Sequence, residues 1–314
     1  MPELPEVETV VRGLQLLLPG RGILSVRLGK TDFIDDPAAI EQHVPGCRIV
    51  EVQRRGKFLV LFLEKSRALQ TAIGFASERF HLIVHLGMTG QLTVRPNAMP
   101  SALHTHVWFA LDNERELRYT DPRRFGRMAL VPESASDSIL GELGLDALEA
   151  SEEEFRGRLA GRRARIKALL LDQSVFRGMG NIYTDESLWR ARIHPARLGT
   201  SLRRDEVVRL YRGVQKVLRE AIRLGGSSIS DYVNAEGEPG EFQLRHRVYQ
   251  REAEKCSRCA AQIRRMIVAG RSSYFCPVCQ RAPHARRSKK RWPAKPVGRK
   301  RISAKNKSAS RRQR

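Results

Sequence analysis

The hydrophobic positions in the first half of the chain change from a helical to a strand-like period. Apolar side chains recur at steps of three and four from Val7 to Leu18, Pro5 lies in the expected first turn, and Pro19-Gly20 would end the helix. Short runs rich in β-branched and aromatic residues follow, separated by turn residues. They are ILSVRL, CRIVEVQ, FLVLFLE, FHLIVHL, QLTV, HVWFAL, LRYT and RMALVP. About eight strands of this kind predict a two-layer antiparallel β-sandwich behind an N-terminal helix.

From about residue 150 the period becomes helical. Four segments carry the pattern, the first with a capping-box start at Ser151. They are SEEEFRGRLAG, RRARIKALLLDQ, NIYTDESLWRAR and RRDEVVRLYRGVQKVLREAIRLG. A Gly-, Ser- and Pro-rich stretch, GGSSISDYVNAEGEPGEF, follows; a loop longer than about 12 residues is usually functional or mobile. The fold class is therefore α+β.

Four of the five cysteines form two C-x-x-C pairs. Cys256 and Cys259 are followed, after a stretch that reads as a short hairpin, by Cys276 and Cys279. Two such pairs can place four thiolates tetrahedrally around one structural Zn²⁺. Disulfide pairing is the alternative, but nothing in the sequence indicates secretion. Cys47 remains, and its β-like surroundings predict a buried thiol.

Composition and charge then narrow the class of protein. The chain has 314 residues, 41% of them hydrophobic, which suits about two domains and excludes wholesale disorder. No run approaches the ~20 apolar residues that cross a bilayer, and the N-terminus lacks a signal-peptide layout. We therefore expect a cytoplasmic protein with no membrane contact.

The basic excess is strongly uneven. The 57 Lys and Arg exceed the 34 Asp and Glu by a net charge of +23. Residues 1–150 carry 17 basic and 19 acidic side chains, residues 151–280 carry 25 and 15, and residues 281–314 carry 15 and none. The last segment lacks apolar periodicity, so we expect a disordered basic tail. An excess of this size indicates a polyanionic partner, most commonly nucleic acid.

The N-terminal sequence MPELPEVET suggests a nucleophile. A small penultimate residue favours removal of Met1, which would leave Pro2 as a free secondary amine. An α-amino group has a pKa near 8, so roughly a tenth is unprotonated at pH 7, against under a thousandth for Lys. Such an amine can form an iminium at a carbonyl-type carbon, and neighbouring Glu3 could protonate a sugar ring oxygen. From composition alone, a simple helix lead-in remains the alternative.

Six blocks occur in register along the chain: MPELPEVET, RRGKF, HLGMTG, RYTDPRRFG, LDQSVFRGMGNIYTDE and the paired cysteines. Together they resemble the formamidopyrimidine-DNA glycosylase family, bifunctional base-excision enzymes of bacteria. The resemblance implies a sandwich domain over 1–147, a helix–two-turn–helix domain over 148–245, a zinc finger over 246–282 and a tail over 283–314. Damaged double-stranded DNA would lie in the cleft between them, and we expect a monomer associated with the nucleoid.

The resemblance also implies roles for individual residues. Pro2 would attack C1′ of the damaged nucleotide and Glu3 would act as general acid in ring opening. Lys57 would contact phosphate and assist proton transfer, and Arg271 would bind the phosphates flanking the lesion and help the second elimination.

Two further sets of residues would hold the DNA itself. Met88, Arg123 and Phe125 match the set that fills the space left by a flipped base. Asn181 follows a glycine-rich turn that could present backbone N–H groups to a phosphate. His104, Arg162 and Lys167 match further phosphate-contacting positions.

The chain departs from the family in two places, and both bear on substrate preference. Residues 65–79 look longer and more irregular than a tight turn, and predict a surface excursion. Phe176 and Arg177 stand where the family usually has small apolar residues, which could alter packing or add a phosphate contact.

Three functions are therefore compared. The first is a glycosylase and abasic-site lyase for oxidised purines such as 8-oxoguanine and formamidopyrimidines. The second is an endonuclease VIII-like enzyme for oxidised pyrimidines, whose members typically start PEGPE where this chain has PELPE. The third is a non-catalytic DNA-damage-binding protein, which the presence of Pro2, Glu3 and Lys57 disfavours.

Overall fold

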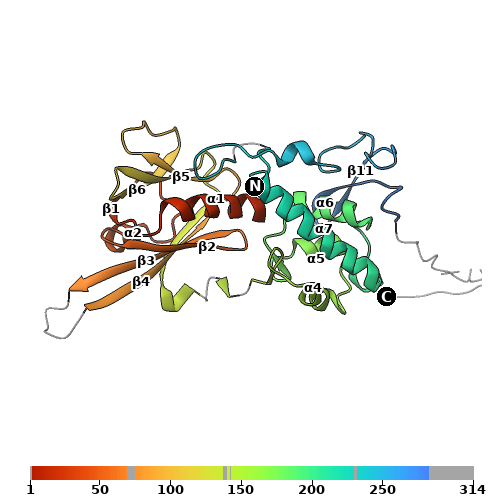
Figure 1. Cartoon of the computed structure of the whole chain (residues 1–314), viewed down its shortest axis with the longest axis horizontal. Helices are drawn as coiled ribbons and strands as arrows, with labels where there is room; N and C mark the ends of the chain where they lie inside the picture. The colour runs from red at the N-terminus through yellow and green to blue at the C-terminus, as the bar shows by residue number, and fades with distance from the viewer. Residues whose placement is uncertain (1, 69–74, 137–139, 142, 230–231, 283–314) are drawn as a thin grey trace, which may run out of the picture. The chain divides into compact units, whose positions relative to one another are not determined.

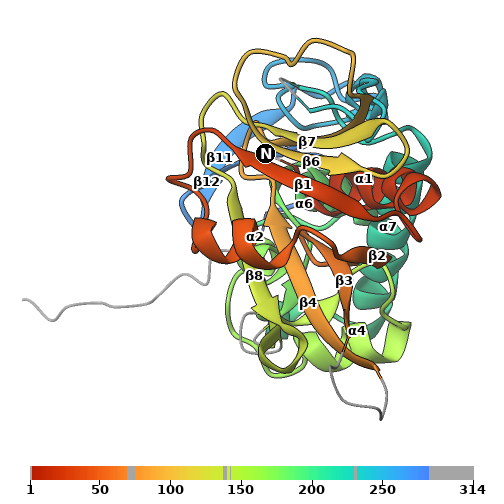
Figure 2. The same cartoon turned by 90° about the vertical axis from the view of Figure 1, so that its left-hand side faces the viewer.

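The computed structural model describes residues 2–68, 75–136, 140–141, 143–229 and 232–282. The predicted tail lies outside these residues. Within them the α+β class and the antiparallel sandwich are confirmed, and Figure 2 shows the two layers of strands. One sheet has the order β2 (Arg48–Arg55), β3 (Phe58–Ala68), β4 (Phe75–His85) and β8 (Arg127–Pro132). The other has the order β1 (Ile23–Leu28), β6 (Thr105–Leu111), β7 (Arg115–Thr120) and β5 (Gln91–Pro96).

The first helix, α1 (Leu4–Leu17), belongs to the sandwich core as its apolar period predicts. Val7, Val10 and Leu14 are fully buried and pack in one cluster with side chains of both sheets. Each such side chain contributes roughly 1.5–3 kcal/mol by leaving water. A second helix, α2 (Pro37–His43), was not predicted, because seven residues are too few to show a period.

The stretch at residues 65–79 is longer than a tight turn, as predicted, but the predicted irregularity is wrong for the part that the structure describes. β3 and β4 stay paired in register from Phe58↔His85 out to Ala68↔Phe75. The stretch is therefore a lengthened hairpin whose arms obtain their hydrogen bonds from each other, and residues 69–74 lie outside the described part.

The helical half contains the four predicted helices around a second core. The capping box of the first is confirmed, since Ser151 Oγ accepts from the Glu154 N–H and the Glu154 carboxylate accepts from the Ser151 N–H. A short parallel pair, β9 with β10, was not predicted because two residues carry no pattern. The helices are α4 (Glu152–Leu159), α5 (Ile166–Leu171), α6 (Asn181–Ala191) and α7 (Arg204–Arg223), and the short strands are β9 (Leu145–Asp146) and β10 (Phe176–Arg177).

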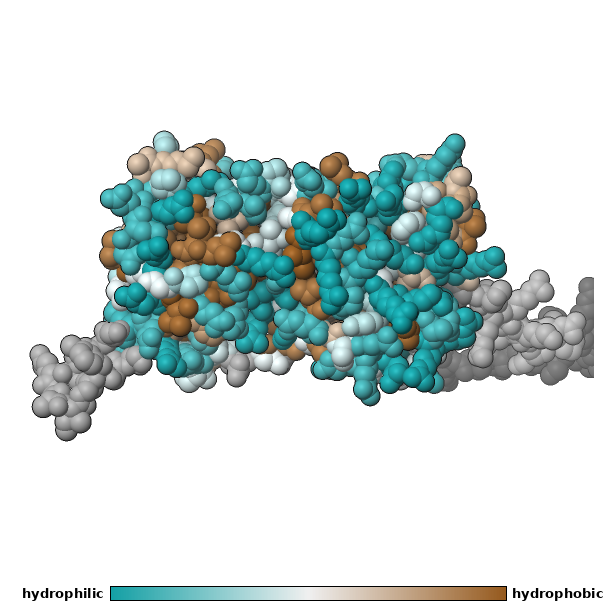
Figure 3. Space-filling view, in the orientation of Figure 1, coloured by the Kyte–Doolittle hydropathy of each residue, from teal (hydrophilic) through white to brown (hydrophobic). Residues whose placement is uncertain are grey.

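Figure 1 shows one end of α7 beside the N-terminal end of α1 near the middle of the picture, and the two helices are in contact. Three single turns of 3-10 helix are also described: η1 (Glu133–Ala135), η2 (Gly199–Ser201) and η3 (Phe242–Arg245). Among the described residues, no helix is both long and apolar enough to span a membrane. The face in Figure 3 is mainly hydrophilic, with separate hydrophobic patches.

In the Gly-rich stretch after α7, residues 225–229 and 232–241 are neither helix nor strand, as expected, and they pack against α1. The Ser227 N–H donates to the Glu6 carboxylate over 2.7 Å, and the Tyr232 hydroxyl donates to the Glu6 carbonyl over 3.2 Å. These contacts tie the loop to the helix that carries the N-terminus.

The predicted hairpin between the cysteine pairs is confirmed as β11 (Arg264–Val268) and β12 (Arg271–Phe275). It has a small core of its own, formed by Trp189, Val248, Cys256, Ile263 and Cys276. Because Trp189 belongs to α6, this core joins the cysteine module to the helical half.

Candidate active site

The N-terminal segment ends against the first turn of α6. Pro2 and Glu3 are buried. The Glu3 carboxylate accepts from the N–H groups of Ile182 and Tyr183 over 3.0 and 3.4 Å. The approach requires glycine at the helix cap, since a Cβ on Gly180 would lie 2.2 Å from the Glu3 carboxyl carbon. Burial raises the pKa of Glu3, against the lowering effects of Lys57 and these N–H groups.

The helix N-terminus at Asn181 already holds one anion of the chain itself. The N–H groups of Ile182 and Tyr183, just after the glycine-rich turn, bind Glu3, and a phosphate contact at Asn181 stays a prediction. Asn181 itself is half-buried at the start of α6 and its side chain interacts with Tyr249. A helix N-terminus stabilises a carboxylate as readily as a phosphate, and here the chain supplies its own.

Lys57 and Arg271 approach the same place from two other elements. Lys57 lies in the turn between β2 and β3, and burial lowers its pKa while Glu3 and Glu6 raise it and Arg271 lowers it further. Arg271 is exposed and opens β12 beside the turn of the cysteine hairpin. The structure therefore brings together four sequence-predicted positions, Pro2, Glu3, Lys57 and Arg271.

Glu6 is a site residue that the sequence analysis missed. Its side chain is buried and accepts from the Glu3 N–H over 2.8 Å, the Ser227 N–H over 2.7 Å and the Tyr183 hydroxyl. Burial and the neighbouring Glu3 raise its pKa to about 7. The signal was available, because a Glu three residues after the helix cap is the spacing of a capping box. Glu6 links the N-terminus, α6 and the Gly-rich loop.

Lys167 is not placed at the surface, contrary to what a phosphate contact requires. It is fully buried in α5, where its Nζ pairs with Asp185 over 2.7 Å and donates to the Ser272 carbonyl over 2.8 Å. Asp185 also accepts from the Tyr274 N–H over 2.9 Å. The buried pair thus fastens β12, and with it Arg271, to α5 and α6.

Met88, Arg123 and Phe125 lie on two neighbouring turns with their side chains accessible. Met88 is 39% exposed and Phe125 is 56% exposed. The Arg123 guanidinium lies 4.5 Å from the centre of the Phe125 ring. The turns approach so closely that a Cβ on Gly87 would lie 2.4 Å from the carbonyl carbon of Phe125. Two exposed apolar side chains beside a cation suit insertion into stacked bases.

Asp121, also missed from sequence, holds these two turns together. It is fully buried and accepts from the Thr89 hydroxyl over 2.5 Å, the Tyr119 hydroxyl over 3.1 Å, and the N–H groups of Arg123 and Gly126 over 3.2 and 3.0 Å. Asp121 lies inside the block RYTDPRRFG, but the block does not predict which four groups donate hydrogen bonds to its carboxylate.

The remaining predicted phosphate contacts are exposed but less closely linked to the site. His104 has a left-handed backbone, with φ 66°, and its carbonyl accepts from the Asp121 N–H over 3.0 Å. Arg162 lies after α4, where its Nε donates to the Arg158 carbonyl over 2.8 Å. Among the described contacts, none joins Arg162 to the Pro2 region.

The four cysteines form a site that fits one Zn²⁺. Their sulfur atoms lie within 4.8 Å of one another. The distances of 3.4, 3.5 and 4.0 Å bracket the ~3.8 Å edge expected of a tetrahedron with Zn–S bonds of about 2.3 Å. All are free thiols, which excludes the disulfide alternative in this structure. With four thiolate ligands the ion has no open position, so its role is structural.

Comparison with known proteins places the same three parts, an N-terminal domain, a helical domain and a zinc finger, in the same order along the chain. Family models match in order: the formamidopyrimidine-DNA glycosylase N-terminal domain at residues 1–128, the H2TH domain of the same enzyme at 143–233, and the zinc finger found in FPG and IleRS at 253–282. A formamidopyrimidine-DNA glycosylase of Pelotomaculum thermopropionicum is 44% identical over 287 residues, covering 90% of this chain and 99% of the relative. One of Solibacter usitatus is also 44% identical, covering 90% and 100%.

Solved structures agree in fold. A complex of Lactococcus lactis Fpg with DNA containing an abasic site has a TM-score of 0.78 and 33% identity, covering 89% of this chain and 100% of that chain. MutM in complex with DNA containing carbocyclic 8-oxo-G also has a TM-score of 0.78 and 33% identity, covering 90% and 100%. From these matches over nine tenths of its length, the chain belongs to the formamidopyrimidine-DNA glycosylase family.

Proposed function

We propose that this protein removes oxidised purines from double-stranded DNA and then cleaves the strand at the resulting abasic site. The observation that carries the proposal is the position of Pro2 and Glu3, buried against the first turn of α6 with Lys57 and Arg271 acting on the same site. Relatives solved with abasic and 8-oxo-G DNA support the substrate class.

The first step uses the amine that removal of Met1 exposes. The unprotonated nitrogen of Pro2 attacks C1′, and the bond from C1′ to the damaged base breaks with its electron pair leaving on the base. The nitrogen, now bonded to C1′, gives up its N–H proton, and the departing base takes up a proton, so the nitrogen regains a lone pair. Glu3 then protonates the ring oxygen O4′, the C1′–O4′ bond breaks, and the nitrogen lone pair forms the iminium. Because burial raises the pKa of Glu3, the protonated form needed for this step is favoured.

Elimination follows from the iminium. Loss of a proton from C2′ moves electrons toward the cationic nitrogen and expels the 3′ phosphate; a second proton loss, from C4′, expels the 5′ phosphate. Burial lowers the pKa of Lys57, which makes it a better proton carrier near neutral pH. Arg271 offers a charge to the phosphates.

The side chains of Met88 and Phe125, on two neighbouring turns, would open the base stack. Flipping a base costs a few kcal/mol, and insertion of a thioether and an aromatic ring offsets part of it. Arg123, with its guanidinium beside Phe125, can donate hydrogen bonds to the base left without a partner.

The experiment compares duplexes that contain 8-oxoguanine or thymine glycol, each with and without borohydride. The proposal expects a trapped covalent adduct on the purine substrate that is absent in Pro2→Gly and retained in the matched control Pro19→Gly, whose proline lies in the turn after α1. An adduct on the pyrimidine substrate alone would favour the endonuclease VIII-like function. That alternative has one supporting observation, since a Lactococcus lactis Fpg structure contains an oxidised pyrimidine. No adduct on either duplex would support the non-catalytic function.

We also propose the predicted domain limits near residues 147 and 245, a monomeric state, and action in the cytoplasm at the nucleoid. Limited proteolysis, sedimentation velocity and imaging of a fluorescent fusion against stained DNA test these in turn. Cleavage within the cores, a dimer, or exclusion from the nucleoid would each contradict one of them.

A further inference from the structure

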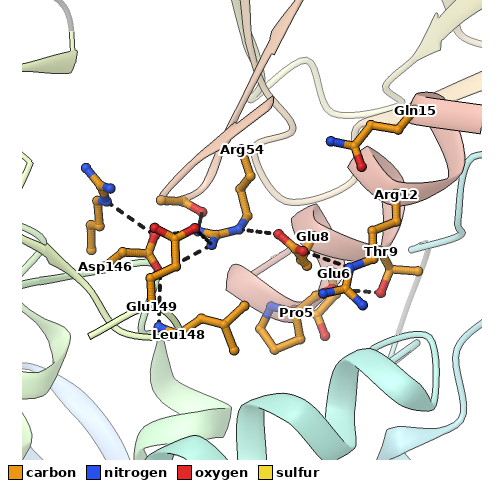
Figure 4. A network of polar contacts seen from close by, with 12 residues as sticks. Pro5, Glu6, Glu8, Thr9, Arg12, Gln15, Arg54, Asp146, Leu148 and Glu149 are labelled. Atoms are coloured by element: carbon orange, nitrogen blue, oxygen red, sulfur yellow. Dashed lines mark hydrogen bonds and ion pairs between the residues drawn. The ribbon is translucent and has the colours of Figure 1, made fainter. Parts of the chain in front are cut away.

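One buried guanidinium joins the segments that surround the N-terminus. The side chain of Arg54, at the end of β2, is 3% exposed. Its Nε donates to Glu8 of α1 over 2.7 Å, and its Nη atoms donate to the two carboxylate oxygens of Asp146 over 2.7 and 3.2 Å. Figure 4 shows Arg54 lying between these carboxylates. A bidentate pair fixes direction as well as distance, because the guanidinium is planar.

The same guanidinium holds the turn that carries Lys57. One Nη of Arg54 also donates to the carbonyl of Gly56 over 3.3 Å, one residue before Lys57. Gly56 has a left-handed backbone, with φ 64°. A Cβ on Gly56 would lie 3.3 Å from the Cβ of Arg177, so the turn rests directly on β10.

Arg177 completes the network from the other side. Its Nε donates to Asp146 over 3.2 Å, so this edge of the guanidinium is engaged inside the protein. Next to it, the carbonyl of Gly178 accepts from the N–H of Leu4 over 3.0 Å. The Lys57 turn therefore rests on β10, and the residue directly after β10 binds the N-terminal segment two residues from Pro2.

We propose that Arg54, with Arg177 opposite it on Asp146, is the positioning residue that sets where Lys57 stands relative to Pro2 and Glu3. The inference rests on the proposed role of Lys57 in elimination. Neither arginine reacts with the DNA. Imine formation depends on Pro2, and the contacts nearest to it, from the Leu4 N–H to Gly178 and from the Ile182 N–H to Glu3, do not involve the Arg54 side chain. The later proton transfers depend on where the Lys57 turn lies.

Removal of Arg54 leaves no buried carboxylate without a partner. Asp146 keeps Arg177 and the N–H of Leu148, which donates over 3.0 Å, and Glu8 keeps Arg12 at 2.8 Å. The variant Arg54→Met should therefore fold, with the Lys57 turn less constrained.

The test is single-turnover cleavage of an 8-oxoguanine duplex, with borohydride trapping at successive times. Displacement of a catalytic group by about 1 Å can cost on the order of 100-fold, so we expect elimination in Arg54→Met to slow by about 10- to 100-fold while imine formation changes by less than about threefold. The trapped intermediate should accumulate, and the dissociation constant for DNA should stay unchanged. Arg177→Met, which leaves the bidentate pair intact, should show the same change in smaller measure.

The matched control is Arg190→Met, which removes a half-buried ion pair of 2.6 Å with Glu220 between α6 and α7. It should leave the ratio of elimination to imine formation unchanged. Lys57→Ala serves as the reference. If Lys57→Ala slows elimination and Arg54→Met does not, the positioning role is refuted and the proposed function stands. If Lys57→Ala leaves the ratio unchanged, the role of Lys57 fails, and the positioning role with it.

Discussion

Replacement of Asp121 by Asn should separate the two turns that carry Met88 and Phe125. One carboxylate oxygen accepts from the Thr89 hydroxyl and the Arg123 N–H, and the other accepts from the Tyr119 hydroxyl and the Gly126 N–H. An amide keeps a single acceptor oxygen. Whichever way it is oriented, its NH₂ group faces a backbone N–H that cannot turn away.

The loss of one acceptor oxygen sets the expected loss in the free energy of unfolding. One buried N–H without a partner costs about 1–3 kcal/mol, and the bonds that remain lose the strengthening that a charged acceptor gives. We therefore expect Asp121→Asn to lower the free energy of unfolding by about 2–4 kcal/mol. The space for relaxation is small, because a Cβ on Gly126 would already lie 1.7 Å from the Tyr119 hydroxyl oxygen.

Urea unfolding measures the loss, with Asp112→Asn as the matched control. Asp112 is exposed and accepts one backbone bond, from Gly22 over 2.9 Å, which an amide oxygen can keep, so its replacement should change stability by less than about 0.5 kcal/mol. In activity assays, Asp121→Asn should slow base excision from duplex DNA and leave cleavage of an abasic single strand unchanged. A loss of stability below that of the control, or equal slowing on both substrates, would refute the reasoning.

Three other predictions concern buried charge and metal. The purified protein should contain one equivalent of zinc by elemental analysis, and its removal should abolish most DNA affinity while the sandwich stays folded by circular dichroism; retained affinity would contradict the coupling of β12 to the cysteine site. The folded pKa of Glu6, about 7 against a usual 4.5, means that the folded state holds an extra proton between these pH values. Relative to Glu6→Gln, the unfolding free energy of the native protein should fall by up to about 3 kcal/mol from pH 4.5 to 7 in urea titrations. If the unfolding free energies of the two proteins change with pH in the same way, the raised pKa of Glu6 is contradicted. Lys167→Met should lower the free energy of unfolding by about 3–5 kcal/mol, because it leaves Asp185 without its cation. The double variant with Asp185→Leu should recover most of that loss, and an equal loss in the single and double variants would contradict the buried ion pair.

The sequence predicted the elements whose patterns are long enough to read. α1, the eight sandwich strands and the four larger helices each have a period or a cap, and the cysteine spacing predicted both hairpin and metal site. The short elements α2, β9 and β10 carry too few residues for a pattern. The lengthened hairpin was misread because its polar and small residues resemble a loop, and only cross-strand pairing shows that they form strands.

The chemistry at the site was predicted unevenly for a physical reason. Pro2, Glu3 and Lys57 are recognisable because the proposed reaction uses functional groups of their own side chains or of the N-terminal amine. Lys167 matched a phosphate-contacting position, but burial and the nearby Asp185 give its charge an internal partner. Asp121 acts only through groups brought together by folding, so no local pattern predicts its role.

The most direct test of the account is mass spectrometry of the protein trapped by borohydride on an 8-oxoguanine duplex. Digestion should yield an N-terminal peptide that lacks Met1 and carries the reduced sugar on the nitrogen of Pro2. A sugar attached to Lys57 or to any other lysine, with an unmodified Pro2, would contradict the assignment of the nucleophile.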